Sequence, residues 1–329
     1  MPKKEISVLG LRLFMLIMLF GGIIFLVITT AGTLLGYGGL LFYAIVTMVT
    51  LLIQYFIGPF MVEKFMRIRR LKREDAPELF SIVERLAANA KIPMPKIGIS
   101  ETPVPNAFAY GRGRGDGHVC VTRGILKVLN KDELTAVLGH EVSHIKNRDV
   151  AFITFLSAIP MILFGVAKSL MWRSGRNKKN NGIIIGIFFL LLYFISNLLV
   201  LYASRIREYY ADRGAVSLGS QPAHLASALF KLVYGCARTD ENSLHLIEGA
   251  RPFFINDPSN ARNEISDLKS IDLDMNGTIS SEELDYLRRQ KIKVGFGQKI
   301  METFSTHPNM LKRIKALSKI NNANDLRRY

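Results

Sequence analysis

Cysteine is scarce in this chain, and its scarcity excludes two classes of protein. The 329 residues include only Cys120 and Cys236. Two thiols cannot build the disulfide framework of a small secreted domain, and they are too few for a cysteine-rich zinc module. Charged residues are also few, at 21% against 49% apolar residues, so the composition does not fit a disordered chain.

Charge is missing entirely from residues 13–62, a stretch of 50 residues near the N-terminus. A glycine-rich break divides this stretch into Leu13–Ala31 and Leu34–Ile57. Each half reaches the ~18 to 20 residues that a helix needs to cross the hydrocarbon of a bilayer. The first half is too long for the apolar core of a secretory signal, and a second apolar run follows it directly. We therefore predict an N-terminal transmembrane hairpin over residues 1–62.

Two further uncharged runs follow, Val150–Ala167 and Asn180–Ser204. The second is 25 residues long and predicts a span by length alone, whereas the first is short and contains Pro160. We predict a second hydrophobic hairpin over residues 150–204. The basic linker between the runs leaves two arrangements open, because both runs can cross or the hairpin can dip into the membrane and stay on one side.

Positive charge exceeds negative charge, with 43 Lys and Arg against 27 Asp and Glu and a formal net charge of +16. Six basic residues lie between Lys64 and Arg73, directly after the first hairpin. Short basic flanks of this kind favour the cytoplasmic side and an anionic lipid surface. The chain has no zinc-finger, RRM or basic-zipper pattern, so no nucleic acid partner is expected. These features predict a multi-pass protein of the cell membrane.

The polar segments predict a small helix-plus-sheet unit over residues 63–149. Apolar residues at helical spacing indicate a helix over 75–91, and short alternating runs indicate strands over 96–100, 107–110 and 119–122. Asn130 followed by Glu133 reads as an N-cap with its capping-box partner, which opens a helix through about Ile145. The remaining residues, 205–329, read as helical. The expected fold is therefore mostly α, with an α+β catalytic unit and two to four transmembrane helices.

The helix after Asn130 contains the sequence His140-Glu141-Val142-Ser143-His144. His140 and His144 are four residues apart, so both imidazoles project from one helix face and can share one metal ion. Glu141 can reach the open coordination position, where it would act as general base toward a zinc-activated water. The alternative is a surface helix with two polar histidines.

A catalytic zinc ion needs a third protein ligand, and Glu208 is the best candidate. Asp212 lies one helical turn after Glu208, where it could accept a hydrogen bond from the second nitrogen of a ligand histidine. The alternative is that Glu208 and Asp212 form helical ion pairs with Arg205 and Arg207.

Four ordered motifs give the chain a family resemblance: Asn106-Ala-Phe-Ala109, His140-Glu141-Val-Ser-His144, Ser204-Arg-x-x-Glu208-Tyr-x-Ala-Asp212, and Phe304-Ser-Thr-His-Pro308 with Arg313-Ile314. With these motifs and its four hydrophobic runs the chain resembles the HtpX-type membrane metalloproteases, which are relatives of the CAAX prenyl endopeptidases. The resemblance implies a gluzincin-like peptidase domain with His140, His144 and Glu208 as Zn²⁺ ligands and Glu141 as catalytic base. It also implies a cytoplasm-facing site that cleaves damaged or misassembled membrane proteins.

Two further sets of residues have candidate roles in such a site. Asn106, Ala107, Phe108 and Ala109 resemble the edge strand that these proteases lay beside an extended polypeptide substrate, although an ordinary core strand fits the same pattern. His307 and Arg313 are candidate catalytic residues that would stabilise the oxyanion. Helix capping and packing by His307 and Arg313 are the alternative.

Residues 272–283 depart from the family pattern, because they fit a twelve-residue EF-hand loop that HtpX-type proteases generally lack. The ligand positions of such a loop are filled by Asp272, Asp274, Asn276, Thr278, Ser280 and Glu283, with Gly277 at the sixth position. Helical stretches flank the loop, so we predict an EF-hand-like insertion over residues 261–290 that binds Ca²⁺ or Mg²⁺. The alternative is an acidic helix–turn–helix that binds no ion.

The motifs together predict a membrane-bound zinc endopeptidase. A prenyl-protein endopeptidase is one alternative, although four hydrophobic runs are few for a large enclosing chamber. A non-catalytic membrane scaffold that binds zinc or calcium is another. Glu141 favours catalysis, because a purely structural zinc site needs no base and usually has a fourth protein ligand.

Overall fold

The structure is a computed structural model that describes residues 32, 36, 39–176, 182–239, 254–255, 261–292 and 295–320. The predicted span over Leu13–Ala31 lies outside these residues. The chain divides into two compact units, one made of residues 1–61 and 151–203 and the other of residues 62–150 and 204–329. Each unit is thus built from two separate segments of the chain.

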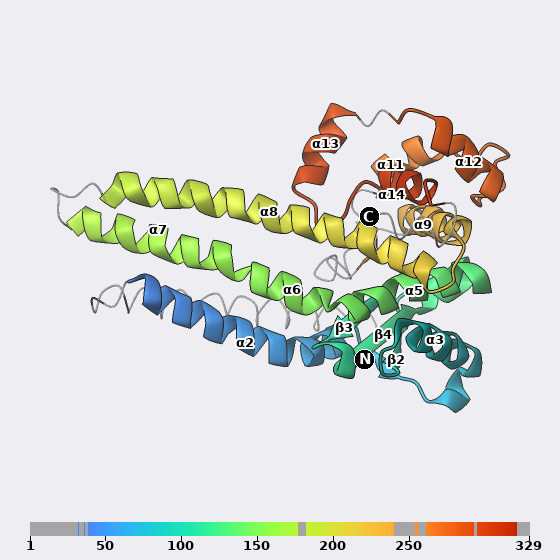
Figure 1. Cartoon of the computed structure of the whole chain (residues 1–329), viewed down its shortest axis with the longest axis horizontal. Helices are drawn as coiled ribbons and strands as arrows, with labels where there is room; N and C mark the ends of the chain where they lie inside the picture. Colours follow the sequence, from blue (N-terminus) through green and yellow to red (C-terminus); the bar gives the residue numbers. More distant parts are fainter. Residues whose placement is uncertain are drawn as a thin grey trace, which may run out of the picture. The chain divides into compact units, whose positions relative to one another are not determined.

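The first unit contains long apolar helices (Figure 1). They are α2 (Leu40–Phe65), the pair α6 (Asp149–Leu156) and α7 (Ala158–Arg176), and the first part of α8 (Gly182–Ser217). Within the described residues three segments are long and apolar enough to cross a membrane, namely Leu41–Phe65, Asp149–Trp172 and Gly182–Ser217. This agrees with the expected two to four spans.

Two helix boundaries differ from the hydropathy pattern. The second predicted span ends at Ile57, but α2 continues to Phe65, past the end of the uncharged stretch at Val62, and so includes Glu63 and Lys64. Helical hydrogen bonding does not depend on the charge of a side chain, so the helix continues past the apolar run. The third run is interrupted at Ser157, and α7 begins there with Pro160 in its first turn, where a proline is tolerated.

The second unit is built on a four-stranded sheet of order β1-β2-β4-β3. The strands are β1 (Arg69–Arg70), β2 (Lys96–Ser100), β3 (Ala107–Gly111) and β4 (Gly117–Thr122). β2 and β4 are parallel, with Gly98 opposite Cys120, while β1 and β3 run antiparallel to their neighbours. All six residues of β4 are buried, whereas β3 has a neighbouring strand on one side only. β3 is therefore an edge strand within the described sheet.

The remaining described elements of the second unit are helical, and α4 (Arg123–Val128) and α5 (Lys131–Asn147) lie against the sheet. Other α-helices of this unit are α3 (Pro77–Ala90), the end of α8, α9 (Pro222–Ala237), α11 (Ala261–Leu268), α12 (Ser281–Arg289), α13 (Phe296–Thr303) and α14 (Met310–Leu317). α5 lies against α3, α9 and β3, and α14 lies against α9 and α12. One hydrophobic core joins these elements, from Ile97 and Val119 in the sheet to Leu229 in α9 and Ile314 in α14. The predicted mostly helical fold with one small sheet is confirmed.

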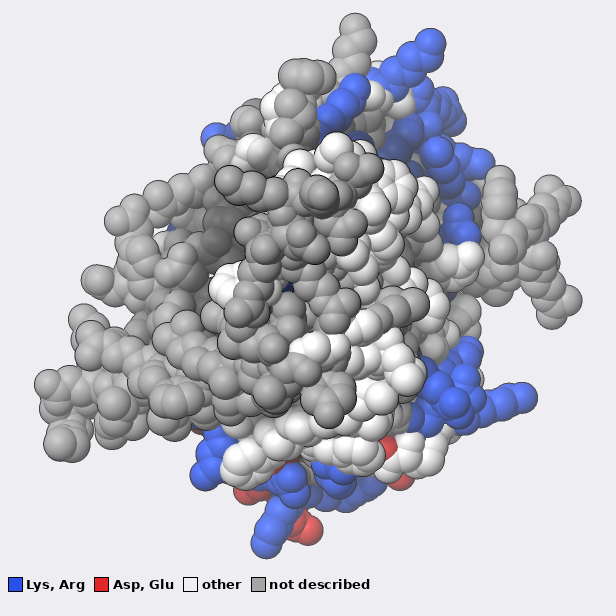
Figure 2. All heavy atoms as spheres, turned by 90° about the vertical axis from the view of Figure 1, so that its left-hand side faces the viewer, with Lys and Arg blue, Asp and Glu red and all other residues white. Residues whose placement is uncertain are grey.

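The described surface carries an uneven charge. Seen from the left-hand side of Figure 1, the described residues in the middle of the face are uncharged, and Lys and Arg outnumber Asp and Glu around them (Figure 2). This distribution agrees with the excess of basic residues in the sequence.

Candidate metal centre

Helix α5 presents the candidate metal ligands from a rigid, buried position. Its N-terminus has the predicted capping box, in which the Asn130 side chain accepts from the Glu133 amide and the Glu133 carboxylate accepts from the Asn130 amide. These two bonds satisfy backbone donors that a helix start leaves unpaired. Fourteen of the 17 residues of α5 are buried or half-buried, and His140, Glu141 and His144 are among them, so the motif lies inside the unit and not on an open surface.

Helix α8 can approach α5 closely because residue 214 on α8 is a glycine. A Cβ at Gly214 would collide with the side chain of Ser143 on α5. The glycine therefore permits a close approach of the two helices. Glu208 lies less than two turns before Gly214 on α8, and this approach brings its carboxylate to the histidines of α5.

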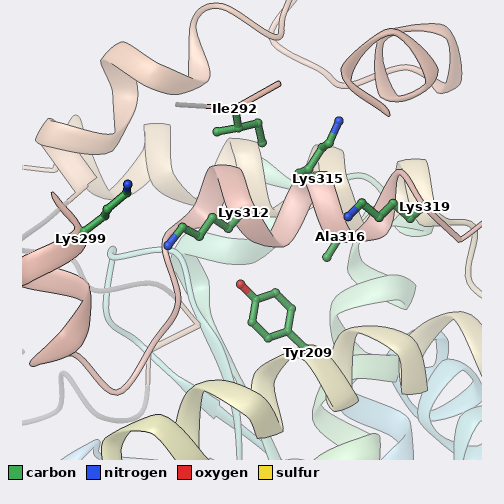
Figure 3. Close-up of a pocket in the computed structure, with 7 residues that line it drawn as sticks. All are labelled: Tyr209, Ile292, Lys299, Lys312, Lys315, Ala316 and Lys319. Carbon is green, nitrogen blue, oxygen red and sulfur yellow. The ribbon is translucent and has the colours of Figure 1, made fainter. Parts of the chain in front are cut away.

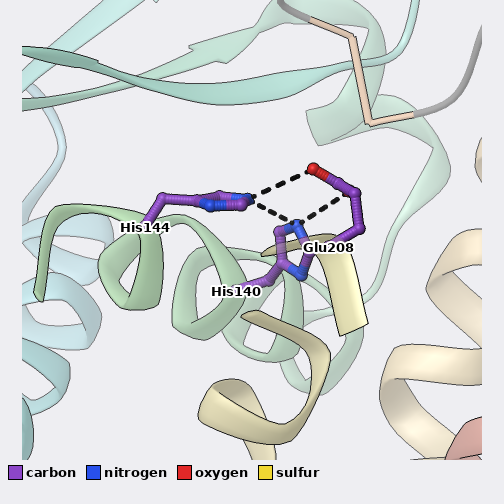
Figure 4. Close-up of side chains that lie close together, drawn as sticks. All are labelled: His140, His144 and Glu208. Atoms are coloured by element: carbon purple, nitrogen blue, oxygen red, sulfur yellow. Dashed lines mark hydrogen bonds and ion pairs between the residues drawn. The ribbon is translucent and has the colours of Figure 1, made fainter. Parts of the chain in front are cut away.

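Three side chains converge at this point (Figure 4). The Nε2 atoms of His140 and His144 are 3.1 Å apart. Glu208 lies 3.6 Å from each of them, with Oε2 nearest His140 and Oε1 nearest His144. One donor atom from each residue lies within 4.8 Å of the other two. Two imidazole nitrogens and one carboxylate oxygen form a donor set that suits zinc and leaves one position open.

Each histidine is oriented by a carboxylate at its other ring nitrogen. Asp212 Oδ1 lies 2.9 Å from Nδ1 of His140, and Asp149 Oδ2 lies 2.7 Å from Nδ1 of His144. Such a carboxylate fixes the tautomer that leaves Nε2 free to bind a metal. The donor atoms thus fit a zinc ion, and the residues that aim them are present.

The role of Asp212 was predicted, but that of Asp149 was missed. Asp149 follows the end of α5, after Arg148 in the left-handed conformation turns the chain. Asp149 also forms an ion pair with Arg207 on α8. The signal in the sequence is an acidic residue five positions after a ligand histidine, and this spacing alone does not reveal that the chain turns back toward His144.

Arg313 is fully buried and faces the acidic residues of the site. Its Nη1 lies 3.1 Å from Glu208 Oε2, and its Nε and Nη2 donate to Asp212 at 3.0 and 2.7 Å. Nη1 also donates to the backbone oxygen of Ile255. The donors of Arg313 thus contact a candidate metal ligand and the residue beside His140, while its role toward an oxyanion stays a prediction.

The arginines that were the alternative partners of Glu208 bind elsewhere. Arg205 donates to the backbone oxygens of Glu302, Thr303 and Ser305, at the end of α13. Arg207 donates to the backbone oxygen of Asn147 and pairs with Asp149. Glu208 and Asp212 instead lie beside His140 and Arg313.

Burial and neighbouring charges shift the titration of the site. Burial raises the pKa of the Glu141 carboxyl above its usual range and lowers the pKa of the His144 imidazole. Burial also opposes protonation of His140, but the neighbouring carboxylates of Asp212 and Glu208 outweigh it and raise the pKa of His140 to about 9. A cation is therefore favoured between these residues, and a metal ion would compete with that proton.

Glu141 lies beside the edge strand, which has its own place in the site. Glu141 lies near Ala109 of β3, whose backbone opposes the rise that burial causes in the pKa of the Glu141 carboxyl. Asn106 pairs with Thr122 of β4 through its backbone, and its side chain accepts a hydrogen bond from the Ile255 amide. Ala107 and Phe108 are buried in the strand. Of the predicted substrate-strand residues, Ala109 therefore lies nearest the candidate base.

His307 lies on the other side of Glu208. Its Nδ1 is 3.7 Å from Glu208 Oε2, and its side chain is 12% exposed. The residue stands shortly before α14, whose N-cap is Asn309. His307 is therefore close to the candidate metal ligands without being the helix cap.

The EF-hand-like loop connects α11 and α12. Asp272, Asp274 and Glu283 each offer an oxygen within 4.8 Å of the others. Gly277 has a φ of +78°, which glycine adopts without strain. Asn276, Thr278 and Ser280 take part in hydrogen bonds inside the loop, and Ser280 is also the N-cap of α12.

Known proteins share these features. Residues 73–321 match the sequence profile of peptidase family M48. The chain is 46% identical over 225 residues to a Protease HtpX homolog of Methanothermobacter thermautotrophicus, covering 68% of this chain and 86% of that protein. It is 32% identical over 283 residues to a Protease HtpX homolog of Moorella thermoacetica, covering 84% of this chain and 83% of that protein.

A solved structure supports the fold. The crystal structure of S. mikatae Ste24p is similar with a TM-score of 0.60 at 18% sequence identity, over 96% of this chain and 66% of that chain. At this identity the likeness concerns the fold alone. The three apolar helices and these relatives together indicate an integral membrane protein.

The family match covers the metal ligands and their orienting residues. Peptidases of family M48 are zinc metalloproteases, in agreement with the His140, His144 and Glu208 group. The predicted resemblance to HtpX-type membrane metalloproteases is confirmed. The chain belongs to peptidase family M48.

Proposed function

We propose that this chain is a membrane-bound zinc endopeptidase that cleaves damaged or misassembled membrane proteins. The observation that supports it best is the convergence of His140, His144 and Glu208 beside Glu141. A zinc ion held by these three residues supplies the positive charge that polarises a scissile carbonyl and acidifies water.

Glu141 is the general base in this proposal. Its raised pKa suits a group that must take up a proton and release it again near neutral pH. The carboxylate takes a proton from the attacking water and then passes it to the leaving amine.

His307 and Arg313 have different roles in the proposal. His307 stabilises the developing oxyanion, since its ring lies near Glu208 and is partly open to a ligand. Arg313 is a positioning residue, because its guanidinium holds Glu208 and Asp212 together inside the core. Asp212 and Asp149 orient the two histidines.

Strand β3 gives the substrate a place to bind. Thr122 donates its backbone amide to Asn106, so Asn106, Phe108 and Tyr110 point their backbone groups toward β4. Alternate residues of an antiparallel strand point the other way, which leaves Ala107 and Ala109 facing the open edge. An extended polypeptide that adds to this edge gains backbone hydrogen bonds with little demand on its sequence. Low sequence demand suits a protease of damaged proteins.

The basic flank after the first hairpin supports a site that faces the cytoplasm. Residues 64–73 contain six Lys and Arg, and they lead directly into the unit that holds the metal ligands. Short basic flanks favour the cytoplasmic side of the membrane. We therefore infer a multi-pass protein of the cell membrane with a cytoplasmic active site.

The Glu141→Gln variant tests the peptidase. Detergent-purified wild type is expected to bind about one zinc ion and to cleave casein, and the variant to keep its zinc and lose at least about 100-fold in rate. Glu282→Gln, a change at an exposed position on α12, is the matched control. Persistent cleavage by Glu141→Gln would contradict the mechanism, and zinc in both proteins with cleavage in neither would favour a scaffold.

We also propose that the loop over residues 272–283 binds a divalent cation, with calcium preferred. Three carboxylate oxygens lie close together and the loop has oxygen donors at each EF-hand ligand position. Calorimetry with Ca²⁺ tests this, and Glu283→Gln is expected to weaken binding by about 10- to 100-fold, since it removes a charged ligand. Glu282→Gln is again the control, and equal calcium binding by both variants would contradict the site.

A further inference from the structure

A basic pocket lies next to the metal centre in the second unit. It has a volume of about 650 Å³ and is lined by Tyr209 and by four lysines, Lys299, Lys312, Lys315 and Lys319. Figure 3 shows the Tyr209 ring rising from α8 toward α14, with Lys312 on α14 and Lys319 just after the end of that helix. Ile292 and Ala316 complete the lining. A volume of this size accommodates a small polar ligand.

The four ammonium groups are poorly neutralised. Lys312 pairs with Glu302, and this is the one carboxylate that contacts a lining lysine among the described residues. Lys315 donates to the backbone oxygens at the end of α12, those of Leu287, Arg288 and Gln290. Lys299 and Lys319 are exposed and form no ion pair with any described residue.

Like charges gathered around one pocket repel each other. Burial lowers the pKa of Lys315, and the nearby Lys319 lowers it further. A bound anion would remove this repulsion and would give Lys299 and Lys319 a partner. None of the described residues that line the pocket is a carboxylate, which argues against a cation or a basic peptide as the ligand.

The place of the pocket along α8 indicates the source of the anion. The uncharged run of α8 ends at Ser204, and Tyr209 follows five residues later, or ~8 Å along a helix. The headgroup layer on each side of a bilayer is about 5 to 8 Å thick. Tyr209 thus lies at the level that phospholipid phosphates occupy when α8 spans the membrane.

Helix α13 adds apolar groups at the same level. Arg205, directly after the uncharged run, holds the end of α13 by three hydrogen bonds to backbone oxygens. Met301 is 46% exposed and Phe304 is 57% exposed, close in sequence to Lys299. Exposed apolar side chains beside lysines are typical of a surface that lies in a membrane interface.

We propose that this lysine pocket is an anion site that binds a phosphate group, and that an anionic phospholipid supplies it. The pocket and the metal centre share two helices, since Tyr209 follows Glu208 on α8 and Lys312 precedes Arg313 on α14. A bound phosphate would therefore lie directly behind the residues that hold the metal ligands. This binding does not depend on peptidase activity.

Native mass spectrometry of the detergent-purified full chain tests the site. The chain is titrated with dioctanoyl phosphatidylglycerol, with dioctanoyl phosphatidylcholine and with inorganic phosphate. Saturable binding of phosphatidylglycerol is expected, with weaker binding of the neutral phosphatidylcholine. The double variant Lys299→Gln/Lys319→Gln is expected to bind phosphatidylglycerol about 30-fold more weakly, since each lysine contributes about fivefold.

Two control variants separate the pocket from general charge. Lys127→Gln/Lys269→Gln removes the same charge from exposed positions outside the pocket and should bind phosphatidylglycerol as wild type does. Lys299→Arg/Lys319→Arg keeps the charge and should keep most of the binding. Inorganic phosphate could also displace the lipid in a way that depends on Lys299 and Lys319. That result would support the anion site and would show that free phosphate is a second ligand for it. Equal phosphatidylglycerol binding by wild type and Lys299→Gln/Lys319→Gln would overturn the proposal.

Discussion

Arg313 joins two acidic residues that have different tasks at the metal centre. Its side chain is fully buried, and it contacts Glu208, a candidate ligand, and Asp212, which orients His140. The two carboxylates raise the pKa of Arg313 above its usual range against the opposing effect of burial. One buried cation thus contacts two buried anions, so its removal leaves both of them with less compensating positive charge.

We expect Arg313→Gln to destabilise the metal-free protein by about 3–5 kcal/mol, the cost of breaking a buried ion pair. Thermal unfolding in detergent measures the effect. Arg123→Gln is the control, because Arg123 forms an exposed ion pair with Glu101 that contributes about 0–1 kcal/mol. Unfolding of Arg313→Gln at the wild-type temperature would show that the ion pairs do not stabilise the fold.

Asp149 is expected to act through His144. Asp149→Asn keeps the shape of the side chain but weakens the hydrogen bond that orients the imidazole. We expect zinc affinity to fall by about 10- to 100-fold, the usual effect of losing such a partner. Competition with a chelator measures the affinity, with the exposed Asp285→Asn as control. Unchanged zinc affinity in Asp149→Asn would assign Asp149 to the ion pair with Arg207 alone.

The residues of the site differ in how far the sequence predicts them. His140, Glu141 and His144 follow from helical spacing, because all three lie on one element. Glu208 needed the family resemblance, since the residues alone left ion pairs with nearby arginines open. Asp149 and the pairing of Arg313 were missed, because they depend on how separate helices meet.

At the scale of elements, strand β3 is both part of the sheet and one edge of it. Helix α5, which carries Glu141, lies against β3, so a substrate strand beside β3 would pass the candidate base. The backbone of an added strand pairs with β3 only at every second residue.

Substrate N-methylation therefore tests the edge-strand proposal without changing the enzyme. A peptide substrate methylated at single backbone nitrogens, one position at a time, should lose cleavage rate at alternate positions. We expect a loss of about 2- to 10-fold at each sensitive position, the value of one hydrogen bond. Rates that fall equally at all positions, or at none, would contradict strand addition.

A polar cluster joins the end of α2 to the sheet. His118 in β4 lies 3.4 Å from Glu63 and 3.3 Å from Asp116, and its ring stacks on Tyr110 of β3. Burial, aided by Lys96, lowers the pKa of His118 despite these carboxylates. The folded protein therefore holds the imidazole neutral at a pH where the unfolded chain would protonate it.

The stability contributed by neutral His118 is present above about pH 6.5, the unfolded pKa, and is lost as the pH falls through the lower folded pKa. We expect the melting temperature of wild type to fall between about pH 7 and about pH 5 more steeply than that of His118→Gln. The variant keeps the other titrating groups and so serves as the comparison. Parallel curves for the two proteins would exclude this source of pH dependence.

The elements themselves were predicted well where their signal is local. The capping box at Asn130, the three strands after residue 95 and the helix over α3 follow from turn residues and periodicity. The strand β1 was missed, because two arginines have no strand pattern and pair with β2 only through the tertiary fold. The end of α2 was placed too early, because hydropathy follows charge and not helical hydrogen bonding.

At the scale of the whole molecule, the two hydrophobic hairpins decide which side of the membrane each segment faces. The basic flank after residue 63 and the basic linker near residue 179 each favour the cytoplasmic side of the membrane. If every apolar run crosses, these two segments lie on opposite sides, so only one of them can be cytoplasmic. The segment Asp149–Trp172 has 24 residues, about 36 Å of helix, which exceeds the ~30 Å of hydrocarbon. Its length therefore favours crossing.

We expect a cysteine at Lys179 to react with a membrane-impermeant maleimide in intact cells and a cysteine at Lys269 to react only after permeabilisation. The experiment needs no cysteine-free background, because Cys120 and Cys236 are both buried and burial raises the pKa of the Cys120 thiol. Wild type without an added cysteine is the control for that assumption. If Lys179→Cys also reacts only after permeabilisation, the second hairpin stays on the cytoplasmic side. The argument from the length of Asp149–Trp172 would then be wrong. Labelling of Lys269→Cys in intact cells would instead contradict a cytoplasmic active site.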